Sequence, residues 1–198
     1  MSFTYYLLFK PYGYLSQFTR ELEGQRCLAD LCPNLPKDVY PVGRLDKDSE
    51  GLLLLTNDRQ LNHKLLNPNF RHPRTYWVQV EGHPNEDAIR ALRQGVDIRI
   101  NKKTHRTAPA KARRMEAAPA LPERDPPVRF RANIPTTWIE LVLTEGKNRQ
   151  VRRMCAKVGH PTLRLLRHAI VDLELGDMEL GELRPIPAST LFQKLWLS

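Results

Sequence analysis

Three carboxylates lie at alternate positions in the segment GRLDKDSEG, residues 43–51: Asp46, Asp48 and Glu50. Acidic residues spaced in this way ahead of a glycine are typical of the first half of a calcium-binding EF-hand loop. The second half of such a loop supplies a glutamate that binds the ion through both of its oxygens, whereas the next six residues here are LLLLTN. The sequence therefore argues against a calcium site.

Clustered carboxylates also hold the ions of two-metal nucleases. Such a site normally draws further acids or histidines from elsewhere, and the six histidines of this chain form no HxH or HxxxH pair. Cys27, Cys32 and Cys155 have no metal-ligand spacing either, and no CxxC occurs. We therefore expect no metal, and we expect three reduced, buried thiols of the kind found in cytosolic proteins.

Asp46 differs from Asp48 and Glu50 in its setting, since a solvated acidic turn accounts for the other two. It lies shortly before residues 52–55, the longest apolar run of the chain, which predicts a fully buried strand. A carboxylate near the start of a buried strand needs a partner, because an unpaired buried charge is costly.

A partner is available on the helix that we predict over residues 147–158. With about 100° of rotation per residue, one apolar stripe of this helix contains Val151, Met154, Cys155 and Val158. The opposite side carries Arg149, Arg153 and Lys157. Arg152 lies at the border of the stripe, and the periodicity leaves open whether it stays at the surface or reaches inward to a buried partner.

The elements that must position these side chains are short strands with few helices between them. A strand over residues 5–10 ends at the turn sequence PYGY, and an irregular loop is predicted over residues 38–51. After the apolar strand, Asn57 or Asp58 can cap a short helix whose leucines face the core. Residues 74–80 then alternate, with Tyr76, Val78 and Val80 on one face.

Further elements follow toward the C-terminus. Helices are predicted over residues 85–94, with Asn85 as the N-cap, and over residues 188–195; strands are predicted over residues 138–143 and 162–175. The proline-rich residues 116–135 have little periodicity, so they predict a loop or insertion. Runs of strands with few helices predict an α+β fold, with a largely antiparallel mixed sheet, flanking helices and a central catalytic cleft.

A chain of 198 residues and 22.9 kDa fits a single domain over residues 1–198, or two lobes that share one sheet. Hydrophobic residues make up 41% and charged residues 27%, which is ordinary for a folded protein. The longest apolar run is far shorter than the ~20 residues that span a bilayer, and residues 1–10 have no basic region ahead of an apolar core. We expect a cytoplasmic monomer without membrane contact.

The net charge of +9 is concentrated in two blocks. Residues 99–131 contain ten basic and three acidic side chains, and residues 147–167 contain seven basic side chains and no acidic one. Two basic blocks separated by neutral chain favour a polyanionic partner, nucleic acid above all. The candidates for phosphate contacts are Lys111, Arg113 and Arg114 in the first block and Lys147, Arg149 and Arg153 in the second.

The motifs resemble those of one enzyme family. GRLD at residues 43–46, with EGLLLLTND at residues 50–58, resembles the catalytic motif of the RNA pseudouridine synthases of the RsuA type. RTYWV at residues 74–78 resembles their tyrosine motif, and EGKNRQVRRM at residues 145–154 resembles their third motif. The motifs follow in the family's order, and the similarity continues to GELR at residues 181–184, so it covers nearly the whole chain.

The resemblance implies a role for each candidate residue. Asp46 would start the breakage of the glycosidic bond, by covalent attack or as a base. Tyr76 would stack against the flipped uracil and later accept the proton from C5. Arg152 would pair with Asp46 and keep it ionised.

The resemblance also implies how the uridine is held. Arg44 would fill the space that the flipped base leaves, and Leu165, or the equally placed Leu163, would form a hydrophobic wall. Extrusion of the nucleotide costs a few kcal/mol, which stacking and insertion would offset. The uracil is rotated and rejoined through carbon, so no metal and no cofactor follow from the motifs.

Many relatives carry an S4-type RNA-binding domain ahead of the first strand. Here that strand begins at Tyr5, so we expect no S4 domain. This departure, with FKPY at residues 9–12 and SQFT at residues 16–19, is similar to the short members that modify large-subunit (23S) ribosomal RNA. The implied partner is that RNA, free or in an assembling ribosomal particle, and the target uridine stays open.

Two other classes of function compete with this interpretation. A catalytically silent RNA-binding or ribosome-assembly protein could keep the same scaffold, but it has no need of Asp46, Tyr76 and Arg152 together. A glycoside hydrolase with paired carboxylates would need a sugar-binding groove rich in aromatic side chains, and the aromatic content is 8%. The sequence therefore favours an RNA-modifying isomerase.

Overall fold

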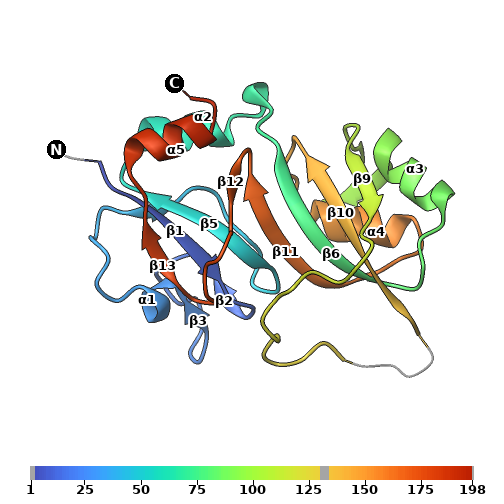
Figure 1. Cartoon of the computed structure of the whole chain (residues 1–198), viewed down its shortest axis with the longest axis horizontal. Helices are drawn as coiled ribbons and strands as arrows, with labels where there is room; N and C mark the ends of the chain where they lie inside the picture. Colours follow the sequence, from blue (N-terminus) through green and yellow to red (C-terminus); the bar gives the residue numbers. More distant parts are fainter. Residues whose placement is uncertain (1–2, 130–133, 198) are drawn as a thin grey trace. The chain divides into compact units, whose positions relative to one another are not determined.

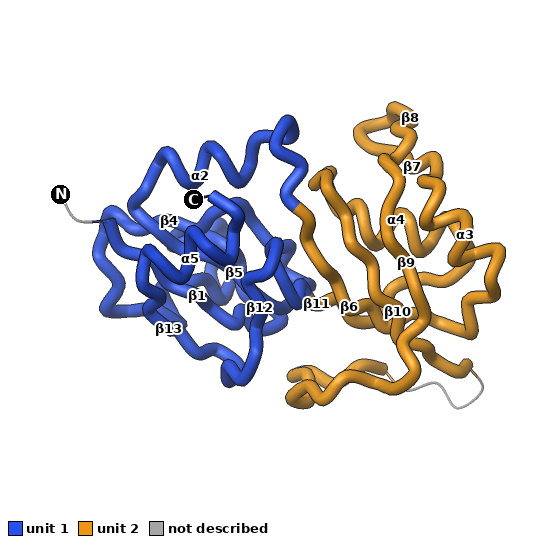
Figure 2. The backbone as a smooth tube through the Cα atoms, turned by 45° about the horizontal axis from the view of Figure 1, so that its top comes forward, with its two compact units in different colours: residues 1–72, 167–198 blue, residues 73–166 orange. Residues whose placement is uncertain are grey.

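The computed structural model describes residues 3–129 and 134–197 of the chain (Figure 1). The chain forms two compact units: unit 1 contains residues 1–72 and 167–198, and unit 2 contains residues 73–166 (Figure 2). Strand β11, Thr162–Ile170, begins in unit 2 and ends in unit 1.

The sheet of unit 1 is built around one strand that is buried along its whole length. The strand order is β13 (Leu183–Pro185), β1 (Tyr5–Lys10), β5 (Glu50–Thr56) and the end of β11, and β1 pairs antiparallel with both of its neighbours. All seven residues of β5 are buried, which confirms the strand predicted from the apolar run over residues 52–55. The short strand β4, Tyr40–Pro41, also pairs with β5.

The prediction of an irregular loop over residues 38–51 was wrong at two places, because β4 and the first two residues of β5 lie within it. Gly51 has φ +113° and pairs with Lys10. A Cβ atom on Gly51 would lie 2.3 Å from the carbonyl oxygen of Arg167, so this glycine lets the backbone of β11 approach. Pairing with β1 and β11 thus extends β5 through Gly51, although a glycine in the sequence usually indicates a turn.

The two faces of this sheet are covered by different segments. On one face, Leu8, Leu53 and Leu55 pack with Leu28 at the start of α1 (Leu28–Leu31) and with residues of the following loop. On the other face, the Tyr5 ring contacts Phe192 of α5 (Ala188–Lys194), with ring centroids 5.7 Å apart. The two-stranded pair β2 (Tyr14–Leu15) and β3 (Arg26–Cys27) is parallel.

Helix α2, Arg59–Leu66, follows β5 as predicted. Asp58 is its N-cap, and its carboxylate accepts hydrogen bonds from the backbone of Gln60 and Leu61. The same carboxylate accepts a hydrogen bond from the hydroxyl of Tyr5 at 3.0 Å. Burial, followed by this contact, raises the pKa of Tyr5 to about 12. A short 3-10 helix, Pro68–Phe70, follows α2.

Unit 2 contains three antiparallel strands in the order β6 (Arg74–Glu81), β10 (Thr136–Leu143) and β9 (Lys111–Arg114), with the start of β11 beside β6. Val78, Val80, Ile139 and Leu141 form one buried face of this sheet, together with side chains of α3 (Glu86–Gln94) and α4 (Gln150–Lys157). The alternation predicted for residues 74–80 and the N-cap role of Asn85 are both confirmed.

Three strands of unit 2 were not predicted: β7 (Asp97–Ile100), β8 (Lys103–Arg106) and β9. β8 and β9 are largely basic, and β7 alternates polar and apolar residues over four positions only. These strands form through pairing, β7 with β8 and β9 with β10, and they contribute few buried side chains, such as Ile98 and Ala112.

Two other boundaries differ from the sequence prediction. Helix α4 begins at Gln150 rather than at residue 147, because Arg149 adopts a left-handed conformation with φ +50°. The strand predicted over residues 162–175 is instead the pair β11 and β12 (Leu173–Glu174), with a turn at Val171.

Strands β2, β3 and β13 and helix α1 were not predicted either, whereas two other predictions agree with the structure. Helix α5 matches the last predicted helix, and residues 116–129 and 134–135 form no helix or strand; residues 130–133 of the predicted loop lie outside the described residues. All but one of the strand pairs whose register is described are antiparallel, so the α+β, largely antiparallel fold is confirmed. Within the described residues, the helices are too short or too polar to cross a membrane.

Candidate active site

The backbone around Asp46 is fixed on both sides within unit 1. The Ser16 hydroxyl donates to the Leu45 carbonyl at 2.8 Å and accepts from the Leu45 amide at 3.1 Å. The Asp46 carbonyl accepts from the Ser49 amide at 3.0 Å, and the Lys47 carbonyl accepts from the Gly13 amide at 2.8 Å. Asp46 itself is half-buried. These contacts fix the backbone that carries the half-buried Asp46 side chain.

Lys10 lies beneath this loop and is completely buried. Its ammonium group donates to the carbonyl oxygens of Ser49 at 2.7 Å and of Pro11 at 2.9 Å. Burial lowers the pKa of Lys10 to about 7, while the charges of Glu50, Asp48 and Asp46 act in the opposite direction. The structure thus adds a buried cation to the segment that carries Asp46.

Sequence reasoning did not select Lys10 as a site residue. A signal was present, because it is the one charged residue in a strand whose other members are apolar or aromatic, and it is followed directly by Pro11. A lysine at the end of such a strand is usually assumed to reach solvent. Here the side chain is completely buried and donates to two backbone carbonyls instead.

Arg44 is exposed, two residues before Asp46. The preceding Gly43 has φ +70°, and a Cβ atom there would lie 2.9 Å from the Leu66 side chain. Among the described residues, no hydrogen bond or ion pair engages the Arg44 guanidinium. An exposed arginine on a fixed turn fits the role of entering the space that a flipped base leaves.

Tyr76 lies on β6 in unit 2, opposite Leu141 of β10. Its half-buried ring packs against the core of this unit, while Val78 and Val80, on the same face, are fully buried. The ring is therefore fixed by packing at the margin of the core. This is the inward face that the alternation of residues 74–80 predicts.

The structure separates the two candidates for the hydrophobic wall. Leu165 is 6% exposed and belongs to the core cluster that Tyr76 contacts. Leu163 is half-buried and is not a member of this cluster, and its carbonyl accepts a hydrogen bond from Arg124 at 3.3 Å. The surroundings of Tyr76 therefore favour Leu165.

Helix α4 buries the apolar stripe that the periodicity predicts, but the predicted outward arginines differ from expectation: Arg149 precedes the helix, and Arg153 is half-buried. Val151, Met154 and Cys155 are buried, Arg152 is half-buried and Lys157 is exposed. Arg149 and Lys147 are exposed at the turn ahead of the helix. A non-glycine residue with positive φ, such as Arg149, costs conformational energy and is typical of functional sites.

Arg153 has a different environment from Arg149. Its guanidinium donates to the carbonyl and the side-chain oxygen of Asn148, both at 3.1 Å, and to the carbonyl of Arg99. These bonds attach α4 to strand β7. A contact between Arg153 and RNA stays a prediction, and the structure adds a positioning role.

A polar cluster around Glu145 connects the start of α4 to strand β8. The Glu145 carboxylate accepts hydrogen bonds from the Gln150 side chain at 2.6 Å and from the Ala108 amide at 2.8 Å. It also lies 3.2 Å from Nε2 of His105 on β8. Gln150 in turn accepts a hydrogen bond from the Lys147 amide at 2.9 Å. The hydrogen bonds of Gln150 and Glu145 therefore fix the turn that carries Lys147 and Arg149.

The basic residues of β9 have partners of their own. Arg113 forms an ion pair with Glu140 at 2.8 Å, which raises the pKa of Arg113, and Glu140 also accepts a hydrogen bond from Trp77. Arg114 donates to the carbonyl of Pro84 at 3.2 Å. Lys111 is exposed.

The candidate residues are thus distributed over both units. Arg44, Asp46 and Lys10 belong to unit 1, and the others belong to unit 2: Tyr76, Lys111, Arg113, Arg114, Lys147, Arg149, Arg152, Arg153 and Leu165. The pairing of Asp46 with Arg152 stays a prediction.

The next features are the three cysteines and the possible metal ligands. All three cysteines are free and buried, as predicted. Burial raises the pKa of Cys155 to about 12 and that of Cys32 to about 11, so neither is a reactive thiolate at neutral pH. In the part of the chain that the structure describes, no three acidic, histidine or cysteine side chains gather in a metal-binding group.

Comparison with known proteins identifies the class. The family model for RNA pseudouridylate synthases matches residues 4–157. A crystal structure of a pseudouridylate synthase superposes with a TM-score of 0.77 and 25% sequence identity, covering 98% of this chain and 74% of that one. The human protein RNA pseudouridylate synthase domain containing 1 shares the fold, with a TM-score of 0.62 and 14% identity over 100% of this chain and 93% of its own.

Curated relatives narrow the class further. The chain is 52% identical to ribosomal large subunit pseudouridine synthase E of Vibrio parahaemolyticus, over 89% of this chain and 71% of that protein. It is 53% identical to the synthase E of Xanthomonas axonopodis, over 90% and 89% respectively. The synthase B of Bacillus subtilis is 36% identical, over 92% and 67%. The chain belongs to the RNA pseudouridine synthase family, of the RsuA type, and is an isomerase that converts uridine in RNA to pseudouridine.

Proposed function

We propose that this enzyme modifies a uridine of the large-subunit (23S) ribosomal RNA. The observation that carries the proposal is the identity of more than half of the aligned residues, over about nine tenths of the chain, to enzymes named for the large ribosomal subunit. The strong positive charge supports a large RNA as substrate. The substrate is the RNA itself, free or in an assembling particle.

In this proposal, Asp46 begins the reaction. The bond between N1 of uracil and C1′ of ribose breaks, the uracil rotates, and a new bond joins its C5 to C1′. C5 loses a proton and N1, freed from the ribose, gains one, so the reaction is an isomerisation that needs no external acceptor for the uracil and no activated water. The fixed backbone on both sides of Asp46 supports this role, because a reacting carboxylate must be held close to its productive geometry.

Tyr76 and Arg152 complete the chemistry that we propose. Tyr76 stacks against the extruded uracil and accepts the C5 proton, and its packing against the core supports a fixed ring. Arg152, half-buried on α4, pairs with Asp46. Arg44 and Leu165 hold the extruded nucleotide. We propose that the enzyme acts as a monomer in the cytoplasm; its three free, buried thiols fit a reducing compartment.

Tritium release tests the substrate. Ribosomal RNA labelled with tritium at C5 of uracil is incubated with enzyme, and released tritium is counted. We expect release from 23S RNA and none from 16S RNA or transfer RNA at equal uridine concentration. Release from 16S RNA alone, or equal release from all three, would contradict the large-subunit assignment without affecting the family.

A further inference from the structure

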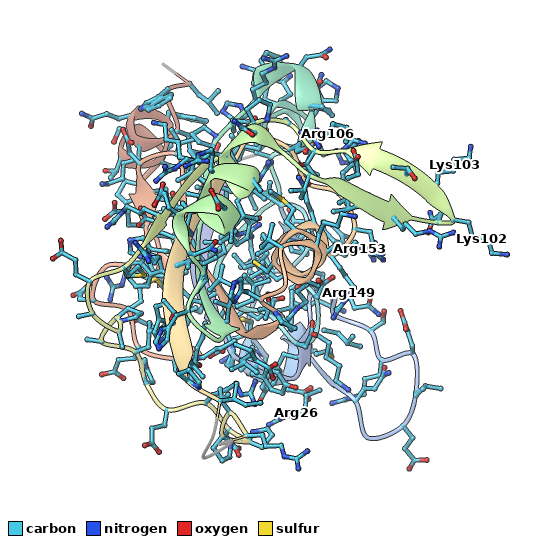
Figure 3. All side chains as sticks on the ribbon, turned by 90° about the vertical axis from the view of Figure 1, so that its right-hand side faces the viewer. Arg26, Lys102, Lys103, Arg106, Arg149 and Arg153 are labelled. Carbon is cyan, nitrogen blue, oxygen red and sulfur yellow. The ribbon has the colours of Figure 1, made fainter. Side chains whose placement is uncertain are left out.

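The hairpin formed by β7 and β8, residues 97–106, is the most basic exposed segment to which no role has been assigned. It carries four basic residues and one acidic residue, and all five are exposed: Arg99, Lys102, Lys103, Arg106 and Asp97. Figure 3 shows the hairpin extending outward from the rest of unit 2, with Lys102 and Lys103 at its tip. Its contribution to the core is limited to Ile98 and the half-buried Ile100 on β7.

The base of the hairpin is anchored. Ile98 is 3% exposed and belongs to the core of unit 2. Arg153 of α4 donates to the carbonyl of Arg99, and His105 contacts the Glu145 carboxylate at 3.2 Å. The hairpin therefore presents its charges from a fixed direction, next to the turn that carries Arg149.

The turn at the tip has a defined geometry. Asn101 and Lys102 have φ values of +48° and +66°, and they link strands in which Ile100 pairs with Lys103. Positive φ at both central positions is the type I′ turn, which matches the twist of a two-residue hairpin and prefers glycine at the second position. Compared with glycine, Lys102 at this second position costs conformational energy, and what it contributes in return is a positive charge.

The charges of the hairpin are mostly uncompensated. Within the described residues, the one ion pair formed by a lysine or arginine of the segment joins Arg106 and Asp97 at 3.7 Å, and both side chains are more than half exposed. Such a pair contributes little energy. Lys102 and Lys103 make no ion pair with any described residue. Cations gathered in this way repel one another and attract a polyanion.

We infer that the β7–β8 hairpin binds the phosphate backbone of a double-stranded segment of the RNA substrate. This inference rests on the proposed function, and it adds a contact surface to it. Single-stranded RNA is typically bound by aromatic side chains on which bases stack, and residues 97–106 contain no Phe, Tyr or Trp. A narrow ribbon with cations alone suits phosphates of a helix whose bases are already stacked.

The test replaces the two tip lysines without weakening the turn. The variant K102G/K103T changes the turn to Asn-Gly, the preferred type I′ sequence, and places a β-branched residue in β8. It should therefore fold at least as well as the wild type. The matched control is K37Q/K64Q, which removes two exposed lysines of unit 1. Affinity is measured between 50 and 300 mM salt for a 20-base-pair RNA duplex and for a 20-nucleotide oligouridine.

We expect K102G/K103T to weaken duplex binding and to lower the slope of log affinity against log salt by about 1.8, because each phosphate contact contributes about 0.9. K103T alone should give about half that change, and K37Q/K64Q none. Oligouridine binding should change much less than duplex binding. A wild-type slope in K102G/K103T, or an equal loss on both RNAs, would overturn the inference.

Tritium release from 23S RNA by the wild type, measured in parallel, separates the two claims. If the wild type releases none from 23S RNA, the proposed substrate fails while the duplex measurement still decides the role of the hairpin. If the wild type is active and the variant keeps the wild-type salt slope, the inference about the hairpin fails alone.

Discussion

Residues 42–49 of unit 1 and the β7–β8 hairpin of unit 2 are both polar, exposed in part and irregular in sequence, yet they are held in opposite ways. The Asp46 segment is bonded through its backbone at Leu45, Asp46 and Lys47, with Lys10 buried beneath it. The described hydrogen bonds and ion pairs that join the hairpin to the rest of unit 2 involve Arg99, His105 and Arg106. Ile98 and Ile100 of β7 pack on the core, whereas Arg99, Lys102, Lys103 and Thr104 are exposed.

This difference matches the demands of the two tasks. A carboxylate that attacks or deprotonates one atom loses rate when it is misplaced by about 1 Å. A cation that contacts phosphate acts through a field that falls off over about 10 Å in 0.1 M salt, so it tolerates motion. We therefore expect changes in the Asp46 segment to affect turnover, and changes in the hairpin to affect affinity and its dependence on salt.

The largest expected effect is that of Asp46→Asn. Product formation should fall by on the order of a thousandfold or more, as for the loss of other catalytic groups that act directly on the substrate, while the salt dependence of RNA binding should stay that of the wild type. Single-turnover kinetics and a salt titration measure both. Appreciable turnover by a pure preparation of the variant would show that Asp46 is not the catalytic carboxylate.

Tyr76→Phe should have the next largest effect. The phenylalanine ring keeps the packing against the core of unit 2 and the stacking on uracil, but it cannot accept the C5 proton. Tritium release should stall while cleavage of the glycosidic bond persists. The measurement is tritium release beside gel detection of RNA that stays bound to the enzyme. Release at the wild-type rate would exclude Tyr76 as the base.

Lys10→Met tests the buried support of the Asp46 segment. The pKa of Lys10 is about 7 in the folded protein, against 10.5 for an exposed lysine. Between these values the unfolded chain binds more protons, so the free energy of unfolding should rise with pH by up to about 1.4 kcal/mol per pH unit. Below pH 7 and above about pH 10.5 both states carry the same charge at this residue, so its contribution is flat there.

The Lys10→Met variant should lack this rise. It also removes the two hydrogen bonds to Ser49 and Pro11, so turnover should fall. Urea unfolding at pH 7, 8 and 9 gives the slope, and Lys64→Met, an exposed lysine, is the control that should keep it. An identical slope in the wild type and Lys10→Met would mean that Lys10 does not titrate in this range.

These residues also show which parts of the candidate site could be predicted from the sequence. Asp46, Tyr76 and Arg152 were selected because they stand in short motifs, and the faces of β6 and α4 followed from periodicity. Lys10 and the β7–β8 hairpin were missed because their structure depends on pairing between segments. Lys10 is buried where β1 pairs with β5, and it donates to the Ser49 carbonyl. The apolar alternation of the hairpin is limited to the four residues of β7, which pair with the polar strand β8. Neither the burial of Lys10 nor the formation of the hairpin can be predicted from the local sequence.

The smallest expected effect concerns β9, the other basic strand of unit 2. Replacing Lys111, Arg113 and Arg114 with glutamine removes three charges, but Arg113 is paired with Glu140 and Arg114 with the Pro84 carbonyl. We therefore expect the salt slope for duplex RNA to fall by about 1, less than for K102G/K103T with only two charges removed. The single-turnover rate at saturating RNA should not change. Loss of the exposed ion pair should cost about 0.5 kcal/mol of stability. A drop in slope that exceeds that of the hairpin variant would reverse the comparison and make β9 the main phosphate-binding strand.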